Sequence, residues 1–449
     1  MVGLSFTLET AKSTLLNTQV QIQTSTHNIE NASNTSYARQ KAVTVTNPAT
    51  LIHGGWVGMG ARVDQIIQTR DQYIEKQLMQ SMSSESYYQT ISDHIDTVQS
   101  VCSDNGANGI SDALGAFWDS WDTLQQDTTS SSSQTEVYDS TQSLANKIKN
   151  TYNDLNELAT DSIPAEVSDN VTEINSLLSQ IVKYNLAISR NESQGVTAND
   201  LRDSRYQAVQ DLSKLIPFSY TEETDGSLTV SMKDGASTIT LVDADKAGSL
   251  QYSSTTNLVG YTQADGSSVA PADNSISGGS LGGLLASIDD ISSYLGELND
   301  FAATLIKEVN ALHTQSSGSS VFSGTNASDI SMVSDFLSTM TAPEESSRAL
   351  AISNLQDSKV TFLDGSSSKF SGFLSNIQEK IGNDGDNAST QQSYYKTLNT
   401  SLQQKQQSVS GVSLDEEMVE LLKDQQIYQA AAKIISNVKD MLDTVISMA

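Results

Sequence analysis

The residue types that most often carry catalysis or bind metals are sparse in this chain of 449 residues. It has four histidines, and none of them has a second histidine at the spacing of a metal site such as His-x-x-x-His. Its single cysteine permits neither an internal disulfide nor a thiolate cluster. Cys102 continues an apolar stripe that contains Ile95 and Val98, which is typical of a buried thiol rather than a nucleophile. We expect surface or packing roles for the histidines, which are His27, His53, His94 and His313.

Three other patterns begin like ligand-binding motifs without completing them. The glycine-rich run at 278–283 lacks both the GxGxxG spacing and a terminal Lys-Ser/Thr, so we expect a turn that leads into a helix. Asp243-Ala244-Asp245 starts like a calcium loop, but Ala247 and Ser254 stand where the ion needs carboxylates. Adjacent acids are expected to be solvated faces; they are Glu222-Glu223, Asp289-Asp290 and Glu416-Glu417. The sequence therefore predicts no catalytic, metal or cofactor site.

The overall composition excludes several classes of protein. With 54 acidic against 25 basic residues, the formal net charge is −29, and such a surface repels nucleic-acid phosphates. No apolar run reaches the roughly 18 residues that would span a bilayer, so no membrane partner is expected. Residues 1–6 lack a basic segment followed by an apolar one, so we expect no cleavable secretory signal.

Both ends of the chain carry apolar seams of the coiled-coil type. Alternating steps of four and three residues connect Leu4, Leu8, Ala11, Leu15, Thr18, Ile22, Ser25 and Ile29. The last segment shows a comparable seam at Leu414, Met418, Leu421, Gln425, Tyr428, Ala432, Ile435 and Leu442, widened by Ile427, Ile434, Val438, Met441 and Val445. A helix over 414–448 would be about 50 Å long. Since neither helix can bury its stripe alone, we expect the termini to pack on each other or on copies of themselves.

Similar periodicity predicts long helices in the middle of the chain, over 74–102, 144–158, 167–188 and 281–312. Pro164 is expected in the first turn of its own helix, where a missing N–H costs little. Between Pro217 and Pro271, apolar residues alternate and Asp-Gly pairs recur, which predicts a small β-meander. We expect loops at the Ser- and Gly-rich stretches 316–328 and 382–390.

These patterns predict a mainly α protein: a long helical bundle with paired N- and C-terminal coiled-coil helices and a small inserted β-rich domain. The predicted division is a terminal helical assembly domain (1–46 and 405–449), a central helical bundle (47–215 and 276–404) and an outer β-rich domain (216–275). Charge follows the same division. The two terminal segments together contribute only −2 to the net charge, whereas 216–300 contributes −10. The ends of the chain are thus the parts least opposed to packing against one another.

Several segments resemble the family of bacterial flagellar rod, hook and hook-associated proteins. Asn28-Ile29-Glu30-Asn31-Ala32-Ser33-Asn34-Thr35-Ser36-Tyr37-Ala38-Arg39-Gln40 is similar to the family's N-terminal motif. The resemblance continues in order through 57–63, Ile67, Arg70-Asp71, Gln77-Leu78, 199–205, 281–285, Val309-Asn310, His313, 410–417 and 426–430. Two positions depart from the pattern: Ser36 stands where Gly is usual, and Ser204 where Gln is usual. The β insertion is also small for the family.

The resemblance implies a structural axial protein rather than an enzyme. Such a protein would be exported through the flagellar type III apparatus and lie outside the cell at the junction of hook and filament. Within the family, the segments Tyr37–Gln40 and Gly411–Glu417 favour this junction position over that of the hook subunit. Implied partners are further copies of the chain, hook subunits, the second junction protein, filament subunits, the filament cap and an export chaperone. Alternatives are the hook subunit, the second junction protein, or a secreted enzyme or adhesin whose β insertion is the working part.

The residues expected to carry assembly lie on the two terminal seams: Leu8, Leu15, Ile22 and Ile29 against Leu421, Tyr428, Ile435 and Leu442. Asn28, Asn31, Tyr37 and Arg39 are expected to shape the turn that leaves the first helix. Tyr37 and Arg39 are also candidate contacts between subunits, because both residue types are favoured as interface anchors. Isolated amphipathic helices are marginal in water, so we expect disordered ends in the free monomer.

Overall fold

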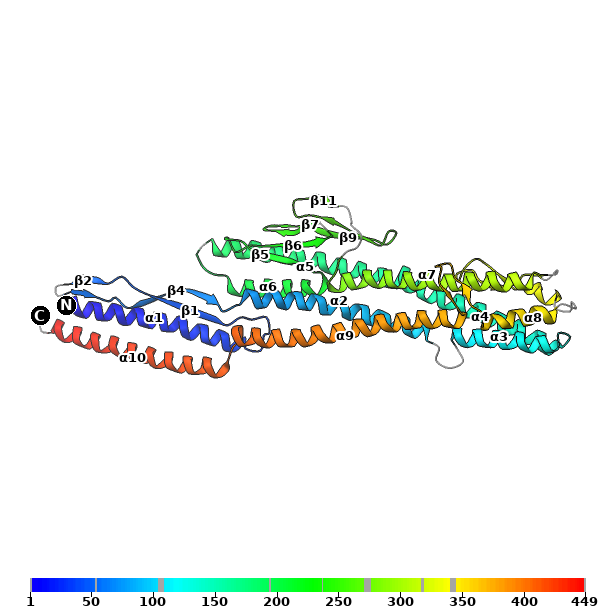
Figure 1. Cartoon of the computed structure of the whole chain (residues 1–449). Helices are drawn as coiled ribbons and strands as arrows, with labels where there is room; N and C mark the ends of the chain where they lie inside the picture. Colours follow the sequence, from blue (N-terminus) through cyan, green and yellow to red (C-terminus); the bar gives the residue numbers. More distant parts are fainter. Residues whose placement is uncertain are drawn as a thin grey trace.

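The computed structural model describes residues 2–52, 55–103, 109–193, 195–235, 237–269, 276–315, 319–339 and 345–447. Figure 1 shows an elongated rod of long helices, with both termini at one end and small sheets on one flank. The mainly α fold predicted from the sequence is confirmed, with small inserted sheets among long helices. None of the described helices combines the length and the apolar character needed to cross a bilayer.

The α-helices are α1 Val2–Glu30, α2 Gln72–Cys102, α3 Ile110–Gln126, α4 Ser131–Glu157, α5 Ile163–Glu192, α6 Asn199–Leu215, α7 Gly279–His313, α8 Glu345–Ser353, α9 Phe370–Ser410 and α10 Leu414–Ser447. The strands are β1 Gln40–Thr46, β2 Thr50–Ile52, β3 Gly55–Val57, β4 Ala61–Gln68, β5 Ser219–Glu222, β6 Leu228–Asp234, β7 Ser237–Asp243, β8 Lys246–Ala247, β9 Ser249–Ser253, β10 Leu258–Thr262, β11 Ser268–Val269, β12 Phe322–Ser323, β13 Ser331–Met332, β14 Val360–Thr361 and β15 Ser367–Ser368. Short π and 3₁₀ segments cover Leu158–Ser162, Ser334–Thr339 and Asn354–Gln356.

Three long helices, α2, α7 and α9, run side by side and form the centre of the rod. The predicted loop at 382–390 is wrong, because this stretch lies inside α9. Gly385 is buried where α9 crosses α2, and a side chain there would press on Gln99 and Ile95. The small residue that lowers helix propensity therefore lets the two helices approach closely, and packing outweighs propensity.

Pro164 lies in the first turn of α5, as the sequence predicts, but no loop separates α5 from the helix before it. A π segment, Leu158–Ser162, joins α4 directly to α5, and the residues on both sides keep right-handed helical dihedral angles. A π-bulge adds a residue to the turn, which accommodates the carbonyl that a proline leaves without its usual N–H donor. The two predicted helices are thus one long interrupted helix.

The predicted β-meander is present between α6 and α7. It forms a four-stranded antiparallel sheet in the order β5-β6-β7-β8 and a three-stranded one in the order β11-β10-β9. Two asparagines on α5 fasten these sheets: the amide of Asn185 exchanges two hydrogen bonds with the backbone of Leu228, and that of Asn175 does so with Leu250. The insertion is therefore fixed along one side of the rod.

The end of the rod far from the termini is held by a buried aromatic cluster, formed by Phe117, Trp118, Trp121, Phe322, Phe336 and Phe370. His313 lies against this cluster, fully buried, with Nε2 3.3 Å from a carboxylate oxygen of Glu345. His94 and the half-buried Cys102 also pack within the rod, whereas His53 lies outside the described residues.

Candidate assembly surface

The terminal helices α1 and α10 lie side by side at one end of the molecule, as the sequence predicts (Figure 1). The seam of α1 faces inward. Its large side chains are half-buried, and the smaller ones between them are almost fully covered, namely Ala11, Thr18 and Ser25. Leu8, Leu15, Ile22 and Ile29 all belong to the half-buried group. Small residues at every second seam position allow the neighbouring backbones to come close.

The seam of α10 has a different register from the one expected. Its buried positions are Glu417, Asp424, Ala431 and Val438, and Leu421, Ile435 and Leu442 lie half-buried between them. Tyr428 occupies the remaining position and stays 41% exposed. Leu414 and Met418, which the sequence placed in the seam, are at least half solvent-accessible. Because two of the true seam positions carry acids, apolar periodicity alone selects the wrong register.

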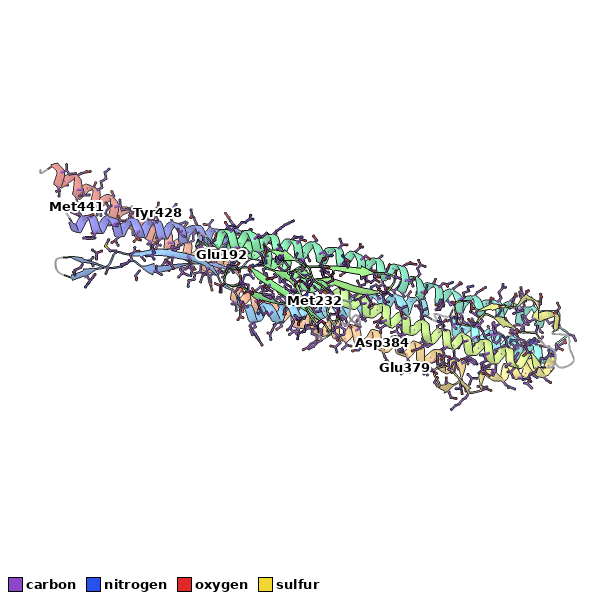
Figure 2. All side chains as sticks on the ribbon, turned by 90° about the horizontal axis from the view of Figure 1, so that it is seen from above. Glu192, Met232, Glu379, Asp384, Tyr428 and Met441 are labelled. Carbon is purple, nitrogen blue, oxygen red and sulfur yellow. The ribbon has the colours of Figure 1, made fainter. Side chains whose placement is uncertain are left out.

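A second apolar stripe runs along the flank of α10 and has no cover within the described protomer. Its exposed members are Ile427, Ile434, Met441 and Val445, at 38 to 56% exposure. Together with the buried Ala431 and Val438 they again alternate by four and three residues. We refer to Ile427, Ile434, Met441 and Val445 as the outer stripe. It is continuous with the buried seam, and Figure 2 labels Met441 near the free end of the helix.

The other side of α1 is covered by an antiparallel ribbon of β1 and β4. The backbone of Ala61 accepts hydrogen bonds from Ser13 and Asn17, and Asn17 accepts one from the Val63 N–H at 2.8 Å. Residues 31–46 were predicted as part of a helical segment. Instead, α1 ends at Glu30 and the chain turns back into β1, because the side chain of Asn28 captures the returning backbone.

The side chain of Asn28 holds the returning chain through three hydrogen bonds. Asn28 donates to the carbonyl of Gln40 at 2.9 Å and accepts from its N–H at 3.0 Å and from the Tyr37 hydroxyl at 2.7 Å. His27 Nδ1 lies 3.1 Å from the same hydroxyl, and Asn31 donates to the His27 carbonyl. Burial raises the pKa of Tyr37, so its hydroxyl keeps its proton. With 7% exposure, Tyr37 leaves little surface for the intersubunit contact expected from the sequence.

Arg39 ties the turn after α1 to the start of α10. Its guanidinium donates to Glu417 at 2.7 Å and to Glu416 at 2.9 Å, and its backbone N–H donates to the Ser410 carbonyl. Glu417 is 2% exposed, so the expectation of a solvated acidic pair is wrong for this residue. The two motif segments at opposite ends of the sequence therefore meet in one ion-pair cluster.

A second polar cluster joins the terminal module, which consists of α1, the strands β1 to β4 and α10, to the rod. Arg70 donates to Glu75 at 2.6 Å, to Asp203 and to the Ser36 carbonyl, and its guanidinium lies 4.2 Å from the centre of the Tyr206 ring. Burial raises the pKa values of Glu75 and Asp203, although the adjacent Arg70 opposes that shift. The joint between the two modules is thus built from buried polar contacts rather than from an apolar core.

The residues of the joint offer no arrangement for chemistry. Among the described residues, no group of three or more His, Cys, Asp or Glu side chains could hold a metal ion. The glycine-rich run at 278–283 leads into α7 as expected, and Gly279 has a φ of +68° at the start of that helix. What the terminal module does present is apolar surface along two long antiparallel helices, α1 and α10.

Comparison with known proteins agrees with this geometry. A family profile described as "Flagellar basal body rod FlgEFG protein C-terminal" matches residues 403–448, which places the chain among the axial structural proteins of bacterial flagella. A second profile, "Flagellar hook-associated protein FlgK helical domain", matches residues 95–329, more than half of the chain. The chain therefore belongs to the FlgK family of hook-associated proteins, which stand at the junction of hook and filament.

Similar proteins of known name support the same family. Flagellar hook-associated protein 1 of Bacillus subtilis is 24% identical, over 98% of this chain and 97% of that protein. The protein of the same name from Salmonella typhimurium is 26% identical over 66% of this chain, but this covers only 54% of its length. The solved structure of the hook junction protein FlgK from Burkholderia pseudomallei shares the fold, with a TM-score of 0.65, 15% identity, and coverage of 75% of this chain and 100% of that one.

Proposed function

We propose that this chain forms a ring between hook and filament, in which α1, α10 and the β1–β4 ribbon of neighbouring copies pack into the inner wall. The observation that carries this proposal is the outer stripe of α10, an uncovered coiled-coil seam next to the covered one. Burying one such large side chain contributes about 1.5–3 kcal/mol. Several copies meeting along about 50 Å of helix would gain much more than the isolated pair of helices.

The assembly residues follow from this arrangement. Leu8, Leu15, Ile22 and Ile29 hold α1 in place with Leu421, Tyr428, Ile435 and Leu442, and the outer stripe supplies the contact to the next copy. Asn28, Asn31, Tyr37 and Arg39 orient the terminal module relative to the rod. The proposed domain division places 1–46 with 405–449 inside and 216–275 outside. The β1–β4 ribbon on α1 adds residues up to 68 to the inner part, and the sheets on the flank of the rod support the outer placement of 216–275 (Figure 1).

The partners are copies of the chain itself, hook subunits on one side, and the second junction protein and filament subunits on the other. A cap protein and an export chaperone act during assembly. The role is structural and not enzymatic, it needs no cofactor, and the protein lies outside the cell after export. Near-neutral terminal segments in a chain of net charge −29 support close packing at the ends and solvent exposure elsewhere.

The test is incorporation of outer-stripe variants into flagella. We expect Ile434→Asp and Met441→Asp to be exported but absent from purified hook–filament junctions, because each buries a charge in the proposed interface. Leu363→Asp is the matched control, since Leu363 is 72% exposed at the other end of the rod. Immunoblots of purified flagella measure incorporation. Normal incorporation of both stripe variants would contradict the proposal.

A further inference from the structure

The paired strands β2 and β3 expose two large apolar side chains. Leu51 and Trp56 are partners across this hairpin and are 63% and 71% exposed. Residues directly opposite each other in an antiparallel pair project on the same face, so the two side chains form one patch. The other two tryptophans, Trp118 and Trp121, are almost fully buried. An exposed Trp beside an exposed Leu is typical of an interface anchor.

The elements that carry this patch and the outer stripe lie on opposite sides of α1. In Figure 1, α1 lies between α10 and the strands labelled β1, β2 and β4. The hairpin patch and the stripe both belong to the end of the molecule that carries the termini. Two apolar surfaces on elements that α1 separates do not contact each other within one copy. They can do so between copies.

The hairpin patch and the first half of the outer stripe both lie in segments that are almost free of charged residues. Residues 42–61, which contain the hairpin, include no Asp, Glu, Lys or Arg, and residues 425–438 of α10 contain only Lys433. Copies of a chain with net charge −29 repel one another over most of their surface. Contact between copies therefore costs least where these two nearly uncharged, apolar segments meet.

We propose that Trp56 and Leu51 of one copy dock on the outer stripe of α10 in the neighbouring copy. This inference rests on the proposed function and specifies its contact. The interface is heterologous: one surface of each copy meets a different surface of the next. Repeated contacts of this kind close into a ring or continue as a helix, as a tubular assembly requires. The partner is thus a second copy of this chain rather than a hook or filament subunit.

The test crosslinks two different single-cysteine forms within assembled flagella. In a Cys102→Ser background, Trp56→Cys and Met441→Cys forms are co-expressed in the source bacterium, and purified flagella are treated with a short bis-maleimide. We expect a covalent dimer only when both forms are present, because each form alone lacks one half of the contact. Trp56→Cys with Tyr394→Cys is the control, since Tyr394 is 59% exposed on α9 of the rod.

Immunoblots of the same samples separate this inference from the proposed function. If both forms enter the junction but give no dimer, the docking is wrong and the ring stands. A dimer from the Trp56→Cys form alone, or a crosslink to a hook or filament subunit, would equally overturn it. A second measurement uses Trp56→Ser, which should lower incorporation about tenfold while Trp56→Phe restores it. Because the side chain is exposed, neither variant should alter the thermal melt, and undiminished incorporation of Trp56→Ser would count against the docking.

Discussion

Single polar side chains set the direction of the chain where α1 ends. Asn28 reproduces a backbone pairing with Gln40, and Arg39 carries the link on to Glu417 in α10. Asn28 and Arg39 could be predicted as functional residues from the sequence, because the motif contains them. Their partners in α10 could not be predicted, because Glu417 and Asp424 interrupt the apolar pattern of the helix. Only the structure, with Arg39 and α1 beside them, shows that these acids belong to the seam.

Loss of Arg39 should loosen α10 more than loss of its exposed partner. Arg39→Ala leaves the carboxylate of Glu417 buried without its cation, which we expect to cost about 2 kcal/mol. Glu416→Ala is the matched control, at about 0.5 kcal/mol or less, because the side chain of Glu416 is 65% exposed. Hydrogen exchange of the α10 amides measures the difference as a change in local opening. Equal effects of the two substitutions would show that the buried Arg39–Glu417 pair stabilises α10 no more than the exposed Arg39–Glu416 pair does.

The raised pKa of Asp290 predicts that the stability of the rod depends on pH. Burial, with Asp384 nearby, raises the pKa of Asp290 from its ordinary 3.8 to about 6. The folded state then binds the proton more tightly, so stability decreases as pH rises through that interval and stays lower above it. Asp290→Asn should stabilise the rod by about 1 kcal/mol at pH 7.5, allowing for its partial exposure, and the gain should vanish near pH 4.

Thermal melts of Asp290→Asn at the two pH values check this sign, and Asp386→Asn on the exposed side of α9 is the control. A stabilisation that is the same at both pH values would instead indicate a packing effect of the amide.

At the scale of elements, long regular helices were predictable and their interruptions were not. The helices α1, α2, α7 and α10 and the β-meander all follow from periodicity, although the register of the α10 seam does not. The middle of α9 was not predicted as a helix, because its Gly, Asn and Asp residues favour a loop locally. Only the packing against α2 explains why a glycine is needed at position 385. The strands β1 and β4 were missed for a similar reason: they depend on α1 as a support rather than on strong alternation of their own.

Two glycines of α9 should therefore respond in opposite ways. A Cβ added at Gly382 would point into open space, with no neighbouring side chain within 4 Å, so Gly382→Ala should stabilise the rod by about 0.5–1 kcal/mol through helix propensity. Gly385→Leu should destabilise it by about 2 kcal/mol or more, since the new side chain meets Ile95 and Gln99 of α2. Chemical denaturation followed by circular dichroism measures both changes, and a stabilising Gly385→Leu would contradict the close crossing of α2 and α9.

At the scale of the whole molecule, two modules differ in how they are held together. The rod has a continuous apolar core along its length, whereas the terminal module has half-buried seams and a polar joint. The sequence indicated this contrast through its charge distribution and its end seams. The residues of the outer stripe were visible in the sequence as a widening of the α10 seam. That they stay uncovered, and that Trp56 is exposed, could not be predicted, since both depend on the packing around α1.

The free monomer should accordingly open first at its ends. We expect hydrogen exchange in α1 and α10 to be at least roughly a hundredfold faster than in α2 and α7, because half-buried seams stabilise helices weakly. The terminal module should gain protection when the protein is assembled. Similar protection of the ends and the rod in the monomer would mean that folding of the ends does not depend on assembly.

The phenotype of a strain that lacks this gene tests the central assignment most directly. Electron microscopy of its cells, together with assay of the medium, should show completed hooks without filaments and unpolymerised filament subunits released outside the cell. Re-expression of the wild-type chain should restore filaments. Filaments of normal length and number on the deletion strain would contradict a role at the junction of hook and filament.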